Sequence, residues 1–434
     1  MRRAHAFLPL LCLIVAPASA HAATVRLGEP ANEYHSGPSV SFLAAPGERN
    51  DLSIVVAADR SVTVRDAGAP LAAGRGCRAL DAHRARCVSA DPGGAIESGD
   101  ANLGDGEDRV VVSVPAAAGW GALSLNGGAG SDLLDASATS RILDPKAETG
   151  TVALGGGPGP DRLIGGVGDD SLYGGGASDT LVGGAGADVL GGDDARRRPL
   201  GADSLDGGPG DDTVTYEERR APVRVDLARP GRAGARRERD SLRSVENLIG
   251  GEAHDVLLGN AGDNLLQGSD TLFQHRGSGD TLAGRGGNDE LLDFGGASRL
   301  NGGAGNDELS GVDARDRLRC GRGRDKLSEA GGALVPRSCE RFITDDHAYG
   351  AFRVRGAAAV VRTRTVDRGG ECQVTLTLRS KRRVIFGRAL LRRARRVAIP
   401  LTPAGRLAAA RHRVVVVDAF ERCGDTHDVW RVRL

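Results

Sequence analysis

The sequence predicts an all-β protein in which a parallel β-roll, a β-solenoid of nonapeptide repeats, is flanked by small N- and C-terminal β domains. Three observations lead to this fold class. Segments of the form Gly-Gly-x-Gly-x-Asp-x-aliphatic-x recur through the centre of the 434 residues. Glycine supplies 65 residues, about twice its usual share of roughly 7%. Aromatic residues make up only 3%, so a single thick core filled with rings is not expected.

Residues 1–22 have the layout of a cleavable secretory signal peptide. Arg2 and Arg3 precede an apolar run at residues 6–15, and small residues at 18–22 offer cleavage positions. The run is too short to span a membrane, although an uncleaved N-terminal anchor is the alternative. The longest later apolar stretch covers only residues 414–417. We therefore expect a secreted, extracellular protein without transmembrane insertion.

Removal of the signal would leave six cysteines, and an even number in an oxidising compartment favours disulfides. Six cysteines allow fifteen connectivities, of which we predict the pairing of sequence neighbours. A zinc site is the alternative, but the chain contains no CxxC spacing. The predicted pairs are Cys77 with Cys87, Cys320 with Cys339, and Cys372 with Cys423.

The segment before the regular repeats divides into two parts. Residues 24–100 contain short strands such as LSIVVA and SVTVRD between Gly, Pro and Asp turns, which predicts an N-terminal β module that caps the roll. Residues 101–155 carry degenerate copies of the repeat, at 104–108 and 127–132, and lead into the regular part.

Regular repeats fill residues 156–328. From Gly156 the chain reads GGPGPDRLI, GGVGDDSLY, GGGASDTLV and GGAGADVLG in one frame, and a second block begins at Gly250 after an irregular insertion at 216–248. A glycine-rich period of nine does not match a helix. It suits a coil in which six residues turn and three extend, with the eighth-place aliphatic residue pointing inward.

The sixth-place aspartates create an electrostatic problem. Two nonapeptides make one coil, so stacking brings the aspartates of repeats n and n+2 side by side, where like charges repel. The thin core cannot stabilise the coils by itself, even before this repulsion is counted. One buried Leu contributes about 2 to 3 kcal/mol, whereas ordering nine residues costs on the order of 10 kcal/mol or more. A cation between the turns is required, and Ca²⁺ tolerates an irregular set of carboxylate and carbonyl oxygens better than Mg²⁺ does.

The four copies from 156 to 191 resemble the RTX or hemolysin-type calcium-binding repeat, and the resemblance covers about residues 154–328. It implies calcium bound between turns by Asp side chains and turn carbonyls. The implied pairs are Asp161 with Asp179, Asp170 with Asp188, Asp289 with Asp307, and Asp307 with Asp325. The implied metal ligands are Asp161, Asp170, Asp179, Asp188, Asp203, Asp212, Asp255, Asp280, Asp289, Asp307, Asp316 and Asp325, with the first-place glycines Gly156, Gly165, Gly174, Gly183 and Gly302.

Several positions depart from the repeat. Ala177 replaces a turn glycine, Asn264 replaces an aspartate, Ser298 stands where a ligand is expected, and the turn before Arg317 has lost two glycines. We expect these positions to bind calcium weakly or to act as spacers. The alternative for the whole block is a disordered Gly/Asp-rich linker, which the regular spacing of Leu and Val disfavours.

A linker at residues 329–347 precedes a basic C-terminal domain at 348–434. Its strands, such as QVTLTLRS and HRVVVVDAF, predict a small β-sandwich-like domain. Residues 352–434 hold 20 Lys and Arg against 6 Asp and Glu, a net +14. Arg alternating with Val is typical of a strand with one solvent-exposed face, which would account for the basic residues. The alternative is that they bind an anionic cell-surface or extracellular polymer. The scarcity of aromatic side chains disfavours nucleic acid.

We predict no enzymatic activity, because the chain has no HExxH, GxSxG or GxxxxGK[ST] motif and its histidines are scattered singly. The predicted function is that of a calcium-binding protein with a structural, adhesive or cell-surface role. The alternative is an exported hydrolase that acts on polysaccharide, with an exposed carboxylate pair between Tyr216 and Glu246. The oligomeric state is left open.

Overall fold

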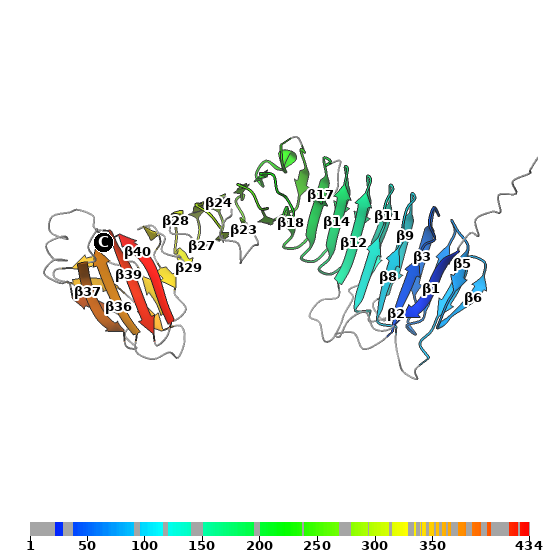
Figure 1. Ribbon diagram of the computed structural model, residues 1–434, viewed down its shortest axis with the longest axis horizontal. Helices are drawn as coiled ribbons and strands as arrows, with labels where there is room; N and C mark the ends of the chain where they lie inside the picture. The colour runs from blue at the N-terminus through cyan, green and yellow to red at the C-terminus, as the bar shows by residue number, and fades with distance from the viewer. Residues whose placement is uncertain are drawn as a thin grey trace, which may run out of the picture.

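The computed structural model shows an all-β chain (Figure 1). It describes residues 22–28, 38–90, 96–115, 120–139, 151–194, 200–236, 238–268, 279–293, 295–311 and 315–328, together with Cys339 and the backbone of short strands after residue 333. The one helical element among these residues is a single 3₁₀ turn, η1 (Pro230–Arg232). No helix of the described part has the length and apolarity that a membrane crossing requires. The predicted signal peptide lies outside the described residues.

The N-terminal strands cap the first coil. They are β1 (Ala23–Gly28), β2 (Ser39–Leu43), β3 (Asp51–Val56), β4 (Val62–Asp66), β5 (Leu71–Ala73), β6 (Cys77–Asp81) and β7 (Arg84–Cys87). Within the cap, β1–β2, β3–β4, β4–β7 and β6–β7 are antiparallel. However, β2 and β3 also pair in parallel with β8 (Ser98–Asn102) and β9 (Arg109–Val114). The parallel coils therefore begin inside the range predicted to form the cap.

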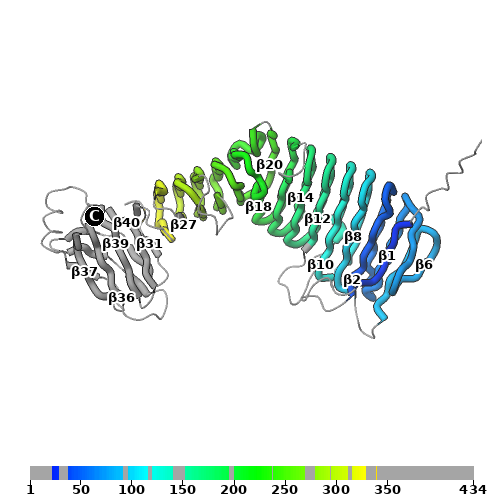
Figure 2. Tube along the Cα trace, in the orientation of Figure 1, coloured from blue at the N-terminus to red at the C-terminus, as the bar shows by residue number. Residues whose placement is uncertain are grey.

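The roll has two faces made of parallel strands (Figures 1 and 2). One face, here called the long sheet, continues β8 with β10 (Ala122–Asn126), β12 (Thr151–Pro158), β14 (Ser171–Gly176), β16 (Val189–Asp193), β18 (Thr213–Thr215), β21 (Asn247–Ile249), β23 (Leu265–Gln267), β25 (Glu290–Asp293), β27 (Glu308–Gly311) and β29 (Lys326–Ser328). The chain alternates between the faces, so each coil contributes one strand to each.

The opposite face is divided into two sheets. The first continues β9 with β11 (Leu133–Thr139), β13 (Arg162–Ile164), β15 (Thr180–Val182), β17 (Ser204–Asp206) and β20 (Ser241–Arg243). The second contains β19 (Arg224–Asp226), β22 (Val256–Leu258), β24 (Thr281–Gly286), β26 (Arg299–Ala304) and β28 (Arg317–Arg322).

The eighth-place leucines form the thin core, as the period of nine predicts. Leu154 pairs in register with Leu172, and Leu163 with Leu181, one coil apart. These side chains are at most 1% exposed. Successive side chains of a strand point to opposite faces, so in a three-residue strand such as β13 or β15 the central leucine is the one that points inward. The core is therefore a column of stacked aliphatic side chains.

Turn glycines occur where a side chain would strain the backbone or meet the neighbouring coil. Gly157 and Gly159 have φ of +114° and +132°, which L-residues rarely adopt. A Cβ on Gly159 would also stand 1.5 Å from the carbonyl oxygen of Gly130 in the preceding coil. Ala177, which replaces a fourth-place glycine, keeps the turn at φ +85°, so the backbone conformation persists despite the Cβ.

The irregular insertion lengthens only one face of the roll. On the long sheet, β18 pairs directly with β21. On the opposite face, β20 pairs with β17, whereas β19, earlier in the chain, pairs with β22. Residues 233–235 bridge the two levels through antiparallel contacts to Val223 and Asp240. The roll bends at this insertion, with η1 and β20 on its outer side (Figures 1 and 2).

Among the described residues two disulfides lie near the ends of the roll. Cys77–Cys87 joins β6 to β7 in the cap, and Cys320–Cys339 joins β28 to the segment after the repeats. Both are predicted pairs. Disulfides persist in oxidising, extracytoplasmic compartments. The backbone places Cys372 opposite Cys423 in an antiparallel pair, while their side chains lie outside the described residues.

After the repeats the backbone changes to antiparallel pairing, apart from two parallel pairs, of β29 with β31 and of β30 with β40. One sheet has the order β30-β40-β39-β36-β37, another β33-β34-β38, and β32 and β35 extend the long sheet beyond β31. These strands are β30 (Leu334–Val335), β31 (Arg341–Ile343), β32 (His347–Gly350), β33 (Arg353–Arg355), β34 (Ala358–Val361), β35 (Thr363–Thr365), β36 (Cys372–Leu378), β37 (Val384–Leu391), β38 (Val397–Pro400), β39 (Val416–Cys423) and β40 (Thr426–Arg433).

Candidate metal sites

The sixth-place aspartates form ladders along the roll through one carboxylate oxygen. The amide N–H of Asp161 donates to Oδ1 of Asp179, one coil later, at 2.8 Å. The same bond joins the other three predicted pairs: Asp170 to Asp188 at 2.8 Å, Asp289 to Asp307 at 3.0 Å, and Asp307 to Asp325 at 3.1 Å. The structure thus brings all four pairs together. In each pair one carboxylate oxygen, Oδ1, accepts a hydrogen bond from a buried main-chain N–H. The sequence analysis did not predict this hydrogen bond.

The second oxygen of many of these carboxylates is buried and has no hydrogen-bond partner. The residues with such an Oδ2 are Asp161, Asp179, Asp188, Asp203, Asp212, Asp289 and Asp307. A buried acceptor without a partner costs free energy, and a row of them is unusual in a native structure. This arrangement fits a bound cation, which would supply the missing partner.

First-place glycines lie where Oδ2 and the next coil converge. A Cβ on Gly156 would stand 2.3 Å from Oδ2 of Asp161 and 2.5 Å from the carbonyl oxygen of Gly174. Corresponding pairs of oxygens crowd the other four predicted glycines, Gly165, Gly174, Gly183 and Gly302. Only glycine leaves this space open. Within the described residues there is no group of three or more His, Cys, Asp or Glu side chains that could hold a metal ion. The space beside each of these glycines is bordered by one carboxylate oxygen and one main-chain carbonyl oxygen.

Without a cation, burial disfavours the charged form of these carboxyls. Burial is the main cause that raises the pKa of Asp161 and Asp188 to about 7 and of Asp179 to about 8. Amide hydrogen bonds lower the pKa, and neighbouring carboxylates raise it again. Asp289 and Asp203 follow the same pattern, with pKa values of about 7 and about 8. A dication at Oδ2 would reverse this effect by stabilising the carboxylate.

The remaining predicted ligands differ in what their second oxygen contacts. Oδ2 of Asp170 accepts from the amide of Gly166, and Oδ2 of Asp255 from that of Gly251, both at 2.6 Å. Asp280 faces Asp293, and both carboxylates approach the first-place Gly268. Asp316 belongs to the ladder through the amide of Ser298. We expect these positions to bind a cation more weakly than those with an unpartnered Oδ2, because their carboxylates already have other contacts.

The ladders also contain residues that the predicted ligand set omitted. Asp108 and Asp132, in the degenerate copies, continue the first ladder and have the same unpartnered Oδ2. The degenerate repeats around them were the sequence signal that could have identified them. Asp240 and Glu246, in the insertion, accept from the amides of Asp203 and Asp212. No period marks them, so spacing could not reveal them.

Two departures from the repeat place a neutral side chain at the sixth position, and only that of Ser298 accepts the ladder bond from the preceding coil. The hydroxyl of Ser298 accepts from the amide of Asp280 at 2.7 Å. The amide oxygen of Asn264 accepts from the amide of Asn260 at 2.8 Å, and the side-chain amide donates to Glu246. Both residues satisfy main-chain groups, which explains why the coil continues through them. Their neutral side chains support the prediction that they act as spacers.

The model of the RTX calcium-binding nonapeptide repeat matches residues 155–190, 200–217, 246–271, 277–309 and 293–327. Residues 155–327 of the roll contain RTX calcium-binding repeats. No curated protein matches the chain. The matched RTX segments contain all twelve predicted ligand aspartates, whereas Asp108, Asp132 and Asp240 of the ladders lie outside them. RTX repeats as a class bind Ca²⁺. The dication supplies positive charge between turns, and the residues that would hold it here are the aspartates with an unpartnered Oδ2 and the first-place glycine carbonyls.

Proposed function

We propose that the protein is a secreted RTX protein whose roll requires calcium for stability, that it has a structural or adhesive role at the cell surface, and that it carries out no catalysis. The observation that carries the proposal is the row of buried carboxylate oxygens without hydrogen-bond partners. Calcium at extracellular concentrations would fill such sites, because extracellular modules bind it weakly. The same sites would stay empty in the cytosol before export.

Secretion is supported by the signal-like residues 1–22 and by the two disulfides. A surface role is supported by charge. The basic C-terminal segment, with its net +14 over residues 352–434, would attract an anionic extracellular polymer. The roll would then act as a spacer whose rigidity depends on calcium.

The test is a calcium titration of the chelated full-length protein, followed by circular dichroism and by native mass spectrometry. We expect the β signal and the melting temperature to rise with calcium and several ions to bind each chain. An unchanged signal in chelator, with no bound calcium, would refute the calcium requirement. Release of sugars from a panel of glycans would instead support a hydrolase.

A further inference from the structure

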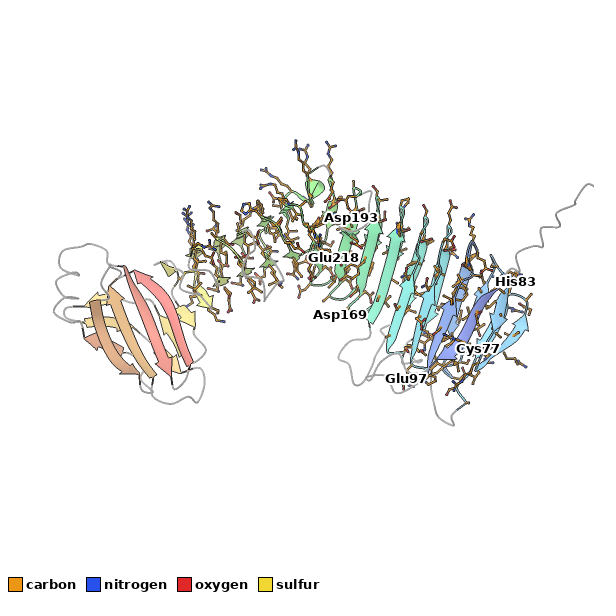
Figure 3. The ribbon with its side chains drawn as sticks, in the orientation of Figure 1. Cys77, His83, Glu97, Asp169, Asp193 and Glu218 are labelled. Carbon is orange, nitrogen blue, oxygen red and sulfur yellow. A yellow bond between two sulfur atoms is a disulfide. The ribbon has the colours of Figure 1, made fainter. Side chains whose placement is uncertain are left out.

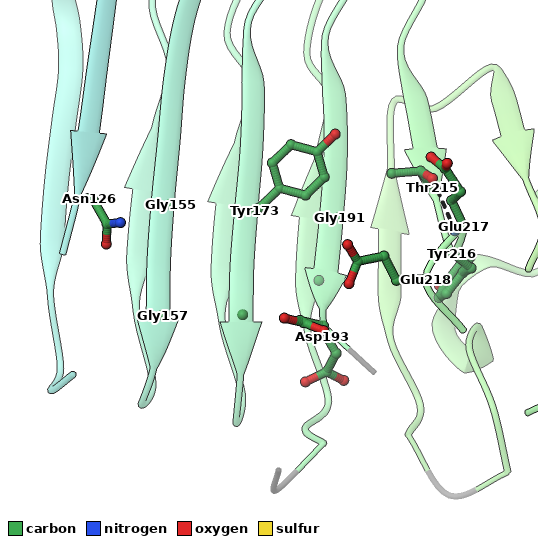
Figure 4. Close-up of a pocket in the computed structure, with 13 residues that line it drawn as sticks. Asn126, Gly155, Gly157, Tyr173, Gly191, Asp193, Thr215, Tyr216, Glu217 and Glu218 are labelled. Atoms are coloured by element: carbon green, nitrogen blue, oxygen red, sulfur yellow. Dashed lines mark hydrogen bonds between the residues drawn. The ribbon is translucent and has the colours of Figure 1, made fainter. Parts of the chain in front are cut away.

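The outer face of the long sheet carries a groove over strands β10 to β18 (Figure 4). Its volume is about 310 Å³, at the lower end of the range of about 300 to 1,000 Å³ for small-molecule sites. Glycines without side chains form its floor, so the backbone of the sheet is flat and open there. They are Gly155, Gly157, Gly175, Gly191 and Gly192.

Tyr173 lies on this floor with its ring exposed. The residue stands between Gly155 and Gly191 in the register of the sheet. A Cβ on Gly191 would be only 2.8 Å from Cδ1 of Tyr173, so the ring lies across the glycine. Figure 4 shows its broad face from outside the sheet, and the residue is 51% exposed. The ring is therefore a flat platform rather than part of the core.

An acidic turn borders the platform. The N–H of Arg219 donates to the carbonyl of Tyr216 at 2.8 Å, which closes a turn with Glu217 and Glu218 exposed at its tip. The N–H of Glu217 also donates to the hydroxyl of Thr215. Burial is the largest cause that raises the pKa of Tyr173, and the negative charges of Glu217 and Glu218 raise it further because these carboxylates lie close to its hydroxyl.

Both ends of this turn are fixed by buried side chains. Tyr216 donates its hydroxyl to Asp240 at 3.0 Å. The Arg219 guanidinium, 3% exposed, contacts Asp193 at 2.8 Å and Glu238 at 3.0 Å. Asp193 and Glu218 lie near each other beside the bend (Figure 3). The acidic turn is thus held in one place relative to Tyr173, and such preorganisation reduces the entropy cost of binding.

We propose that this groove binds a linear polysaccharide of pyranose units that carry no acidic groups. The apolar face of a sugar ring would stack on Tyr173, and its hydroxyls would donate to Glu217 and Glu218. The floor row of Asn126, Gly155, Tyr173 and Gly191 runs along the roll axis in steps of about 4.8 Å, a spacing similar to the advance of one pyranose. Acidic glycans would be repelled by the turn.

The groups proposed to contact the sugar, Tyr173, Glu217 and Glu218, are separate from the ladder carboxylates, which face inward between coils. Only the floor residue Gly192 also borders a ladder carboxylate, that of Asp203. The inference needs a folded roll but not the surface role proposed above. Loss of calcium dependence would therefore leave it intact, and loss of sugar binding would leave the calcium proposal intact.

The experiment is isothermal titration of the full-length, calcium-loaded protein with neutral, amino and uronic acid hexasaccharides. We expect a neutral or amino sugar to bind and the uronic acid chain not to bind. Tyr173→Ala should weaken binding about tenfold or more by removing the platform, whereas Tyr173→Phe should keep it within about threefold. Val167→Ala, at an exposed turn residue outside the groove, is the matched control and should change nothing.

Gly155→Gln tests the groove without removing the tyrosine. A Cβ there meets only the carbonyl oxygen of Leu125, at 4.0 Å, so the fold should persist while the new side chain blocks the floor. Binding that survives both Gly155→Gln and Tyr173→Ala would overturn the proposal. So would preference for the acidic chain, binding of a basic peptide in place of every sugar, or no binding of any sugar to the folded protein.

Discussion

At the scale of single residues, a ladder aspartate with an unpartnered Oδ2 has two separate tasks. Oδ1 accepts a main-chain N–H of the preceding coil, and Oδ2 faces the first-place glycine. Asparagine would keep an oxygen for the first task and lose the charge needed for the second. The two tasks can therefore be separated by substitution.

Asp179→Asn should remove calcium binding at its turn while the coil stays folded. In calcium we expect a loss of stability of about 1 to 3 kcal/mol, typical of a charged contact. In chelator, above pH 8, the same change should stabilise the roll, because the pKa of Asp179 is raised to about 8 and its carboxylate is charged at that pH beside Asp161 and Asp203. Thermal melts and calcium counts by native mass spectrometry measure both effects. Asp211→Asn, an exposed carboxylate with the same charge change, is the control, and equal effects of the two variants would contradict the assignment.

Ala177→Gly should stabilise the protein by about 0.5 to 1 kcal/mol, because φ of +85° strains any residue with a Cβ. Ala185→Gly, in the next repeat and without a positive φ, should instead destabilise. Denaturant midpoints of the two variants give the comparison. The prediction fails if both substitutions lower the midpoint.

At the scale of elements, the insertion is attached to the roll by a buried ionic cluster. Arg219 contacts Asp193 of β16 and Glu238 of the insertion, and all three side chains are at most 5% exposed. Burial raises the pKa of Asp193 to about 6 in spite of the arginine. Removing one partner from such a cluster leaves an uncompensated buried charge.

Arg219→Met should therefore destabilise the protein by about 3 to 5 kcal/mol. It should also increase hydrogen exchange in β19 and β20, because their attachment to the roll is lost. The neighbouring Arg220 is exposed and 3.8 Å from Glu252, so Arg220→Met should change stability by less than about 1 kcal/mol. Similar effects of the two variants would show that the cluster does not hold the insertion.

At the scale of the whole molecule, calcium and protons compete for the same carboxylates. The pKa of Asp161, Asp188 and Asp289 is raised from 3.8 to about 7. A raised pKa gives a stabilising contribution that is complete below pH 3.8 and is lost as the pH rises through about 7. The chelated protein should thus melt at a higher temperature at pH 5 than at pH 8. Calcium should reverse this order, and melts at both pH values test it; a chelated protein with no pH dependence would contradict it.

Much of this architecture could be predicted from the sequence because the repeat is periodic. A fixed spacing places Leu163 and Leu181 in one column and Asp161 beside Asp179, whatever the exact turn geometry. The insertion has no period, so the crossing of β19 and β20, and with it the positions of Asp240 and Glu246, depends on tertiary contacts. The groove could not be predicted for the same reason. It depends on the position of Tyr173 beside Gly191 and beside a turn 44 residues later in the chain.

The ladder has a direction along the chain. In the ladder bonds described above, the donor amide belongs to the earlier coil and the accepting side chain to a later one. The two residues are 18 apart where the repeat is regular and 24 or more apart where extra residues intervene. In a protein exported N-terminus first, a coil would be finished only when the following one has left the membrane, so folding outside would trail translocation by one coil. The last repeat has no successor. There the Cys320–Cys339 bond and the pairing of β29 with β31 close the roll. The last coil would therefore need disulfide formation as well as calcium to become fully ordered.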